Sequence, residues 1–296
     1  MKDLAGKVAV VTGGASGIGL ALGHAFGQQG MKIVVADVEI PAMDAAVKQL
    51  HHAGIDAVGI SVDVSSSDSV DALAEATFER FGTAHVICNN AGVGPGGVSW
   101  ELPQSVWRWV IDVDLWGVIN GIRSFVPRLV EQGEGHVVNT ASVGGLLASP
   151  GMAPYSAAKH AVVGLSESLK QDLQLAGSPV GVTILCPSMT RTRMNNSGRN
   201  WPSRLGAMPQ ERLQPGHPLT RDSYRDRMDN EAMEPDVVAD LAVAAVLGEE
   251  SWVICDPQFE ARATEHLMRM VTASKKITRK SLGSRVVGNQ SYCAQV

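Results

Sequence analysis

Short runs of β-branched and other apolar residues alternate along most of this chain with longer segments of helical spacing. Parallel strands need helical crossovers that bury both faces of the sheet, so such strands consist of continuous apolar runs. The alternation therefore predicts an α/β fold with a doubly wound, parallel, seven-stranded sheet of the Rossmann type. The predicted strands are Val8–Thr12, Lys32–Ala36, Ala57–Val62, His85–Cys88, Gly135–Asn139, Val180–Leu185 and Trp252–Cys255.

No linker or internal repeat interrupts this alternation, which predicts a single dinucleotide-binding and catalytic domain over residues 1–256. Residues 193–235 are longer and more polar than a strand connection needs, and a loop of that length in a compact domain is usually functional. We expect this insertion to cover the substrate. Residues 257–296 are expected to form a C-terminal helical extension and a solvated basic tail with no specific partner.

Composition excludes several other functional classes. Apolar residues make up 45% of the chain and charged residues 19%, which is typical of a globular protein. The net charge of −5 argues against a nucleic-acid partner, because such surfaces need an excess of basic residues. We also expect a cytoplasmic protein, because there is no signal peptide and no apolar run long enough to cross a membrane.

The cysteines and histidines indicate no metal centre. The four cysteines form no CxxC pair, and His51 and His52 are adjacent helix positions whose side chains point apart. We therefore expect neither a zinc site nor a disulfide framework.

A glycine-rich turn follows the first predicted strand, where Thr-Gly-Gly-Ala-Ser-Gly-Ile-Gly occupies residues 12–19 ahead of an apolar helical run. Glycines permit a tight turn and close approach of a ligand, and the unpaired amides of a helix N-terminus attract phosphate. The expected pyrophosphate contacts are Gly13, Ser16, Gly17, Ile18 and Gly19.

Asp37 ends the second strand at the separation from the glycines where an acid binds the adenosine ribose hydroxyls. A carboxylate at this position repels the 2′-phosphate of NADP, and Ala15, Ser16 and Val38 offer no compensating cation. The expected cofactor is NAD.

Tyr155 and Lys159 are spaced i,i+4 at the start of a predicted helix, so both side chains lie on one face. An ammonium beside a phenol stabilises the phenolate and makes it a usable base near neutral pH. Ser142 precedes this pair, after the fifth strand. The Tyr155 and Lys159 pair can form a proton-transfer unit.

The combined motifs resemble the short-chain dehydrogenase/reductase family over about residues 5–256: TGGASGIG, Asp37, Asp63, NNAG, Ser142 and YSAAK occur in the family's order. The resemblance implies that Ser142 orients the substrate oxygen, that Tyr155 is the acid/base and also contacts the cofactor, and that Lys159 binds the nicotinamide ribose. It also implies that the remaining cofactor contacts are Asp63, Val64, Asn90, Ala91, Gly92, Pro187, Thr190 and Thr192.

Two positions depart from the family pattern. Asp114 stands where the family has a catalytic asparagine, and Ser188 replaces the glycine after Pro187. In the family, the asparagine acts largely through its main-chain carbonyl, so an aspartate of the same shape can keep that role, although its charge alters the surroundings of Lys159. These departures motivate an alternative function, a catalytically impaired dinucleotide-binding regulator or scaffold.

We expect an NAD-dependent short-chain alcohol dehydrogenase or ketone reductase. The insertion lies where the family places its substrate-covering segment, and its apolar residues predict a hydrophobic secondary alcohol or ketone: Trp201, Met208, Leu213 and Tyr224. The apolar surplus of the helices around 107–129 and 155–175 predicts a homodimer or homotetramer.

Overall fold

A computed structural model describes residues 1–209 and 231–282 of the chain, with side chains as far as residue 274. Contacts divide the chain into two compact units, Met1–Cys255 and Asp256–Val296. The described part of the second unit is helix α9 (Pro257–Leu282). The predicted insertion residues Leu213 and Tyr224 and the last part of the predicted tail, residues 283–296, lie outside the described residues.

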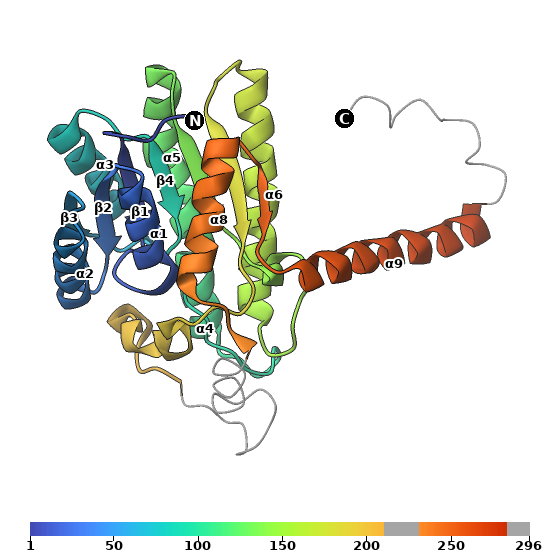
Figure 1. Cartoon of the computed structure of the whole chain (residues 1–296). Helices are drawn as coiled ribbons and strands as arrows, with labels where there is room; N and C mark the ends of the chain where they lie inside the picture. The colour runs from blue at the N-terminus through green and yellow to red at the C-terminus, as the bar shows by residue number, and fades with distance from the viewer. Residues whose placement is uncertain (210–230, 283–296) are drawn as a thin grey trace. The chain divides into compact units, whose positions relative to one another are not determined.

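A seven-stranded, all-parallel sheet forms the centre of the first unit (Figure 1). Its strand order is β3-β2-β1-β4-β5-β6-β7, which confirms the predicted doubly wound α/β fold. Each predicted strand overlaps an observed one. The strands are β1 (Val8–Thr12), β2 (Lys32–Asp37), β3 (Ala57–Ser61), β4 (Val86–Asn89), β5 (His136–Thr140), β6 (Gly181–Cys186) and β7 (Trp252–Ile254).

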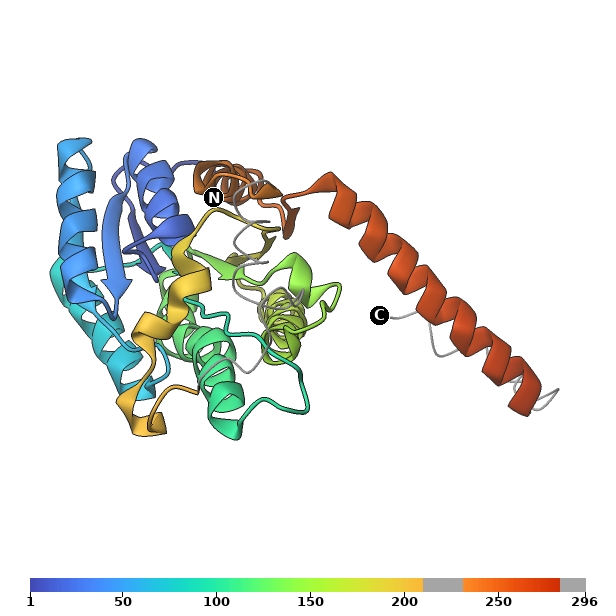
Figure 2. The same ribbon diagram turned by 90° about the horizontal axis from the view of Figure 1, so that it is seen from below.

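Helices cover both faces of this sheet, because alternate strand residues point to opposite sides. Ala9 and Val11 join a core with α1, α2 and α8, whereas Val8 and Val10 join one with α3, α5 and α6. Seen from below, α8 and α6 lie on opposite sides of the sheet (Figure 2). The helices are α1 (Gly17–Gln28), α2 (Ile40–His52), α3 (Ser67–Phe81), α4 (Gln104–Ile111), α5 (Gly117–Gln132), α6 (Ala153–Leu175) and α8 (Pro235–Gly248).

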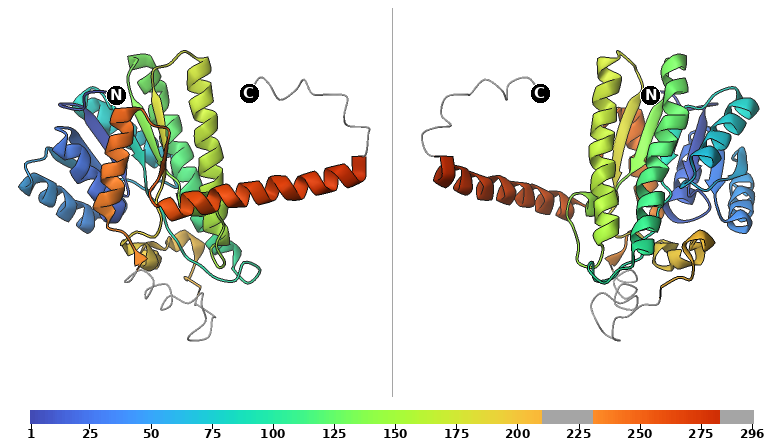
Figure 3. Two further views of the ribbon diagram at one scale, coloured as in Figure 1. Left: turned by 45° about the vertical axis from the view of Figure 1, so that its right-hand side comes forward. Right: turned by 180° about the vertical axis from the view of Figure 1, so that it is seen from behind.

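The long helices α5 and α6 lie on the same face of the sheet (Figure 3). Between α4 and α5 the chain makes a π-helical turn, η1 (Asp112–Trp116), within the region predicted as one helix. Shorter 3₁₀ segments follow β5 and β6: η2 (Val143–Gly145), η3 (Arg193–Asn200) and η4 (Ser203–Leu205).

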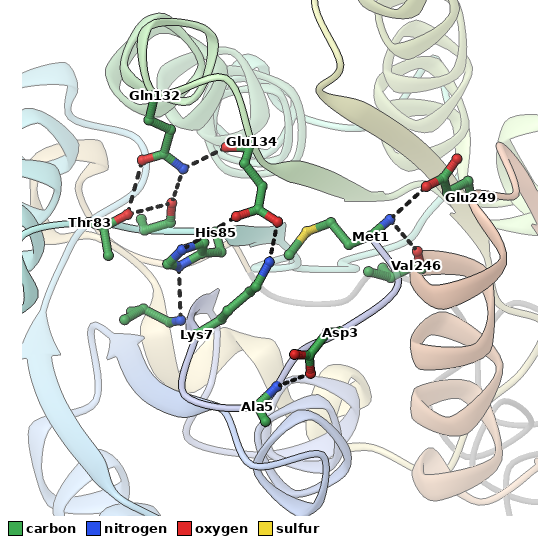
Figure 4. Close-up of polar contacts among 12 residues, drawn as sticks. Met1, Asp3, Ala5, Lys7, Thr83, His85, Gln132, Glu134, Val246 and Glu249 are labelled. Carbon is green, nitrogen blue, oxygen red and sulfur yellow. Dashed lines mark hydrogen bonds and ion pairs between the residues drawn. The ribbon is translucent and has the colours of Figure 1, made fainter.

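Polar contacts fasten the amino-terminal edge of the sheet (Figure 4). The Met1 amino group lies 3.1 Å from Glu249 Oε1 and 3.3 Å from the Val246 carbonyl oxygen at the end of α8. Lys7 pairs with Glu134 just before β5. These ion pairs lie at the edge opposite the carboxyl ends of the strands, where ligands bind in open α/β sheets.

Within residues 1–209 and 231–282, no helix combines the length and the apolarity that crossing a membrane requires.

Candidate active site

The glycine turn between β1 and α1 adopts a backbone that its glycines make possible. Gly13 and Gly17 have φ values of +65° and +54°, in the left-handed region that favours glycine. A Cβ atom on Gly19 would lie 2.1 Å from the Gly13 carbonyl oxygen. Ser16 caps α1 without a side-chain hydrogen bond, and Ile18 is half-buried in the first turn. First-turn amides of a helix have no partner within it, so they fit a pyrophosphate.

Asp37 lies beside this turn at the carboxyl end of β2, and its carboxylate is held by two backbone amides. The Ala15 N–H donates to Oδ2 at 3.0 Å, and the Glu39 N–H donates to Oδ1 at 2.9 Å. Each carboxylate oxygen has a second lone pair for a ligand. The buried carboxylate is therefore fixed in place as a hydrogen-bond acceptor next to the glycine turn.

The loop after β3 carries two of the predicted cofactor contacts, Asp63 and Val64. Asp63 is exposed, and its Oδ1 accepts hydrogen bonds from the amide and the hydroxyl of Ser65 at 3.0 and 2.7 Å. Val64 is buried, and its carbonyl accepts a hydrogen bond from Asn120 Nδ2 at 2.9 Å. Asn120, on α5, thus fixes the backbone of a predicted cofactor contact.

The loop after β4 packs directly onto the glycine turn. The Thr12 hydroxyl accepts hydrogen bonds from the amides of Asn90 and Ala91 at 2.9 and 3.2 Å. Asn90 Nδ2 in turn donates to the Thr12 carbonyl at 3.0 Å. A Cβ atom on Gly13 would lie 2.9 Å from the Ala91 Cα atom, so the two loops touch backbone to backbone.

Ser142 and Tyr155 meet at Gly144. A Cβ atom built there would lie 3.3 Å from Ser142 Oγ and 3.2 Å from Tyr155 Cε1. Ser142 Oγ accepts a hydrogen bond from the Gly144 amide at 3.0 Å, which fixes the hydroxyl after β5. The half-buried Tyr155 lies in the first turn of α6. Absence of a side chain at Gly144 therefore lets the two hydroxyl-bearing residues approach.

Lys159 lies one helical turn beyond Tyr155 and is buried. Its Nζ is 5.6 Å from the centre of the Tyr155 ring and donates to the Thr140 carbonyl at 2.9 Å. The predicted helical spacing thus brings the ammonium to the tyrosine.

Asp114 also faces this ammonium, at 3.6 Å from Oδ2 to Nζ. Burial raises the pKa of Asp114 to about 6, and the Lys159 charge and the Val93 amide oppose that rise. A Cβ atom on Gly92 would touch both side chains, with Asp114 Oδ2 at 3.4 Å and Lys159 Nζ at 3.7 Å. The last residue of the NNAG motif therefore lies against the buried pair.

The loop after β6 contacts both Ser142 and the glycine turn. The Pro187 carbonyl accepts hydrogen bonds from the Val143 amide at 3.0 Å and from Ser142 Oγ at 3.4 Å. A Cβ atom on Gly17 would lie 2.9 Å from the Thr192 methyl group. Thr190 is buried, and its hydroxyl donates to the Ser188 carbonyl at 3.0 Å. The turn thus closes with a serine in place of the family's glycine.

The segment from η3 to η4 contacts the ends of β2 and β3. Arg199 Nε and Nη2 donate to Glu39 Oε1 at 2.9 and 2.6 Å, and Asn200 Nδ2 donates to the same oxygen at 2.9 Å. The hydrogen bonds from Arg199 lower the pKa of Glu39. Arg204 contacts Ser65 Oγ at 3.1 Å. These contacts place the segment, gold in Figure 1, at the carboxyl edge beside the predicted nucleotide contacts.

Sequence reasoning missed three features of this site: the π-helical turn that carries Asp114, the anchoring role of Asn120, and the bridge from Arg199 to Glu39. Asn120 left a usable signal, because it is a polar residue in a largely apolar helix. The other two left none, since the residue types of Asp112–Trp116 do not distinguish a π turn from an ordinary helical turn, and the bridge joins residues 160 positions apart.

Comparison with known proteins gives the same assignment as the motifs. The model of the short chain dehydrogenase family matches residues 7–203. A C alpha-dehydrogenase of Sphingobium sp. is 32% identical over 96% of this chain and 92% of its own length. A 1-deoxy-11-beta-hydroxypentalenate dehydrogenase of Streptomyces arenae is 42% identical over 64% of this chain and 68% of its own length.

Comparison with solved structures supports the same family assignment. A short chain dehydrogenase/reductase from Burkholderia phymatum in complex with NAD is 38% identical and superposes with a TM-score of 0.85, over 89% of this chain and 94% of that one. Other structural neighbours hold NADPH or NADP. With the family model matching about two thirds of the sequence and the site motifs in place, this chain belongs to the short-chain dehydrogenase/reductase family of oxidoreductases.

Proposed function

We propose that this protein is an NAD-dependent dehydrogenase or reductase that interconverts a hydrophobic secondary alcohol and its ketone. The observation that carries the proposal is the convergence of Ser142 and Tyr155 at Gly144, with the Lys159 ammonium 5.6 Å from the tyrosine ring. The loop after β6 connects this group to the glycine turn. This geometry argues against a scaffold that has lost catalysis.

The nucleotide half fits a dinucleotide. The first-turn amides of α1 would hold the pyrophosphate, Asp37 the adenosine ribose, and Asp63 and Val64 the adenine. Asn90, Ala91 and Gly92 would line the adenosine side, and Pro187, Thr190 and Thr192 would hold the carboxamide. The bound cofactor supplies the hydride acceptor or donor.

Asp37 favours NAD over NADP, because its carboxylate is fixed where a 2′-phosphate would approach. Arg199 reaches the same end of β2, but its guanidinium is engaged by Glu39 and by the carbonyls of Arg193 and Asn196. Arg199 is thus committed to acceptors within the protein rather than to a phosphate.

During alcohol oxidation, Ser142 Oγ donates a hydrogen bond to the substrate oxygen and Tyr155 takes the hydroxyl proton. Lys159 stabilises the tyrosine in its anionic form and binds the nicotinamide ribose. In ketone reduction Tyr155 returns the proton to the carbonyl oxygen.

Tyr155 packs in an apolar cluster with Val93, Trp109 and Trp201. Trp201 belongs to the 193–235 insertion and makes an edge contact with Trp109 at 5.1 Å between ring centres. We propose that the described part of this insertion, residues 193–209, covers an apolar substrate next to Tyr155. The names of the relatives, which include a pentalenate dehydrogenase, support a bulky secondary alcohol.

Screening secondary alcohols with NAD and with NADP, by absorbance of the reduced cofactor, tests the proposal. Turnover with aryl or cyclic secondary alcohols and a preference for NAD are expected. Cofactor binding without turnover on any alcohol or ketone would instead favour the binding-protein alternative.

We also propose a homodimer or homotetramer. Val237 and Leu241 on α8 and Trp252 on the edge strand β7 are exposed apolar side chains, and edge strands are usually covered. Light scattering coupled to gel filtration gives the mass, and a monomer would contradict this proposal.

A further inference from the structure

Asp114 is a carboxylate enclosed within the protein, with a 0% exposed side chain. It lies in the π-helical turn η1, and its Oδ1 accepts a hydrogen bond from the Val93 amide at 2.8 Å. Its Oδ2 faces the Lys159 ammonium at 3.6 Å. A π turn inserts one residue into a helix, and such turns occur frequently at functional sites. Here the π turn positions the Asp114 carboxylate beside the Lys159 ammonium.

The Lys159 ammonium has three N–H donors. One donates to the Thr140 carbonyl at 2.9 Å, and the ammonium as a whole faces Asp114 at 3.6 Å. The same ammonium lies 5.6 Å from the centre of the Tyr155 ring. The positive charge that would stabilise a Tyr155 phenolate therefore also interacts with the buried Asp114 carboxylate. A neutral asparagine at this position would not compete with Tyr155 for that charge.

The charged and titratable groups around Asp114 are few among the described contacts. Helix α6 presents Lys159 and Tyr155, whereas the loop after β4 presents the Val93 amide and Gly92. On η1 itself, Asp112 pairs with Arg204 at 3.2 Å. Burial raises the pKa of Asp114 to about 6, so its charge changes within the pH range of ordinary assays.

We propose that Asp114 is a positioning residue that offsets part of the Lys159 charge and thereby shifts the proton affinity of Tyr155 upward. This inference rests on the proposed function, because Tyr155 must be the acid/base for the shift to affect catalysis. Ionised Asp114 weakens the stabilisation of the phenolate and holds the ammonium between β5 and η1. Protonated Asp114 leaves the full Lys159 charge acting on Tyr155.

The first test measures kcat/KM for alcohol oxidation against pH in the wild type and in Asp114→Asn. Removing the negative charge stabilises the phenolate, so the acid limb of the profile is expected to move about one pH unit lower. Asp112→Asn, a change of the same kind two residues away on the same turn, is the matched control and leaves the profile in place. Asp114→Ser serves as a second uncharged variant if the asparagine variant does not fold.

The second test needs no turnover. The chain has three tyrosines, so the ultraviolet absorbance of tyrosinate, measured with NAD present, can be assigned to Tyr155 by subtracting the titration of Tyr155→Phe. The same subtraction in the Asp114→Asn background is expected to give a lower Tyr155 pKa. An unchanged Tyr155 titration, or an equal shift in Asp112→Asn, overturns the inference. Absence of any turnover in the wild type overturns the proposed function instead, while the absorbance titration still decides the role of Asp114.

Discussion

At the scale of single residues, the proposed role of Asp37 in binding the adenosine ribose can be tested by substitution. Its two carboxylate oxygens are held by the Ala15 and Glu39 amides, so the negative charge cannot swing away from an incoming 2′-phosphate. Asp37→Ser is expected to lower kcat/KM with NAD and to raise it with NADP, changing the ratio by about tenfold or more, because one charge repulsion of over 1.4 kcal/mol is removed. Steady-state kinetics with both cofactors measure the ratio, and an unchanged ratio would show that Asp37 does not face the ribose.

A substitution at Gly144 tests whether the close approach of Ser142 and Tyr155 matters for activity. A methyl group there would press on Tyr155 Cε1 at 3.2 Å and Ser142 Oγ at 3.3 Å, so Gly144→Ala is expected to lower kcat about tenfold or more by displacing them. Gly164→Ala is the matched control, because nothing lies within 4 Å of its Cβ position in α6. That control is expected to stabilise the helix by about 0.5–1 kcal/mol and to keep full activity. Equal activity of the two variants would place the catalytic centre elsewhere.

At the scale of elements, the sequence best predicted those features that depend on residues close together in the chain. Each β run is apolar and ends in polar residues, so the sequence alone was enough to predict that Asp37, Asn90 and Ser142 lie at one sheet edge. The i,i+4 spacing likewise brought Lys159 to Tyr155. In contrast, the residue types of Asp112–Trp116 did not predict the observed π turn, because they do not distinguish it from an ordinary helical turn.

The bridge between η3 and Glu39 is another tertiary feature with a testable effect. Arg199→Gln removes two short hydrogen bonds that tie the segment to the residues after β2. We expect the dissociation constant for NAD to rise several-fold, about 3–10-fold, because the segment must then be ordered when the cofactor binds. Quenching of tryptophan fluorescence measures this constant.

Arg191→Gln is the control for that variant, because Arg191 forms an exposed ion pair with Glu234 in the same loop region. Exposed pairs contribute little, so the control is expected to bind NAD as the wild type does. Equal binding by both variants and the wild type would show that the bridge does not act on the cofactor.

At the scale of the whole molecule, His136 links folding to pH. It is the first residue of β5, is buried, and has Nε2 at 2.7 Å from Thr183 Oγ1. Burial lowers its pKa from 6.5 to about 4, so between these values the unfolded chain binds more protons than the folded protein. Stability from His136 is therefore present above pH 6.5 and is lost as the pH falls toward about 4.

Urea unfolding across this pH range tests the linkage. His136→Gln is expected to lose less stability on acidification than the wild type, by about 3 kcal/mol at most. The pKa of Asp114 is shifted in the opposite direction, upward. Asp114 is present in both the wild type and His136→Gln, so the difference between their pH dependences isolates the histidine. Identical pH dependence would mean that His136 does not titrate during unfolding.

The most direct test of the central claim compares the wild type with Tyr155→Phe, using NAD and any secondary alcohol that the screen identifies. The variant keeps the ring but removes the hydroxyl that exchanges the proton, so turnover is expected to fall by about 10²–10⁴-fold. NAD binding, measured by tryptophan fluorescence, is expected to stay within about threefold, since the nucleotide contacts are untouched. Retained turnover in Tyr155→Phe would contradict the assignment of Tyr155 as the acid/base.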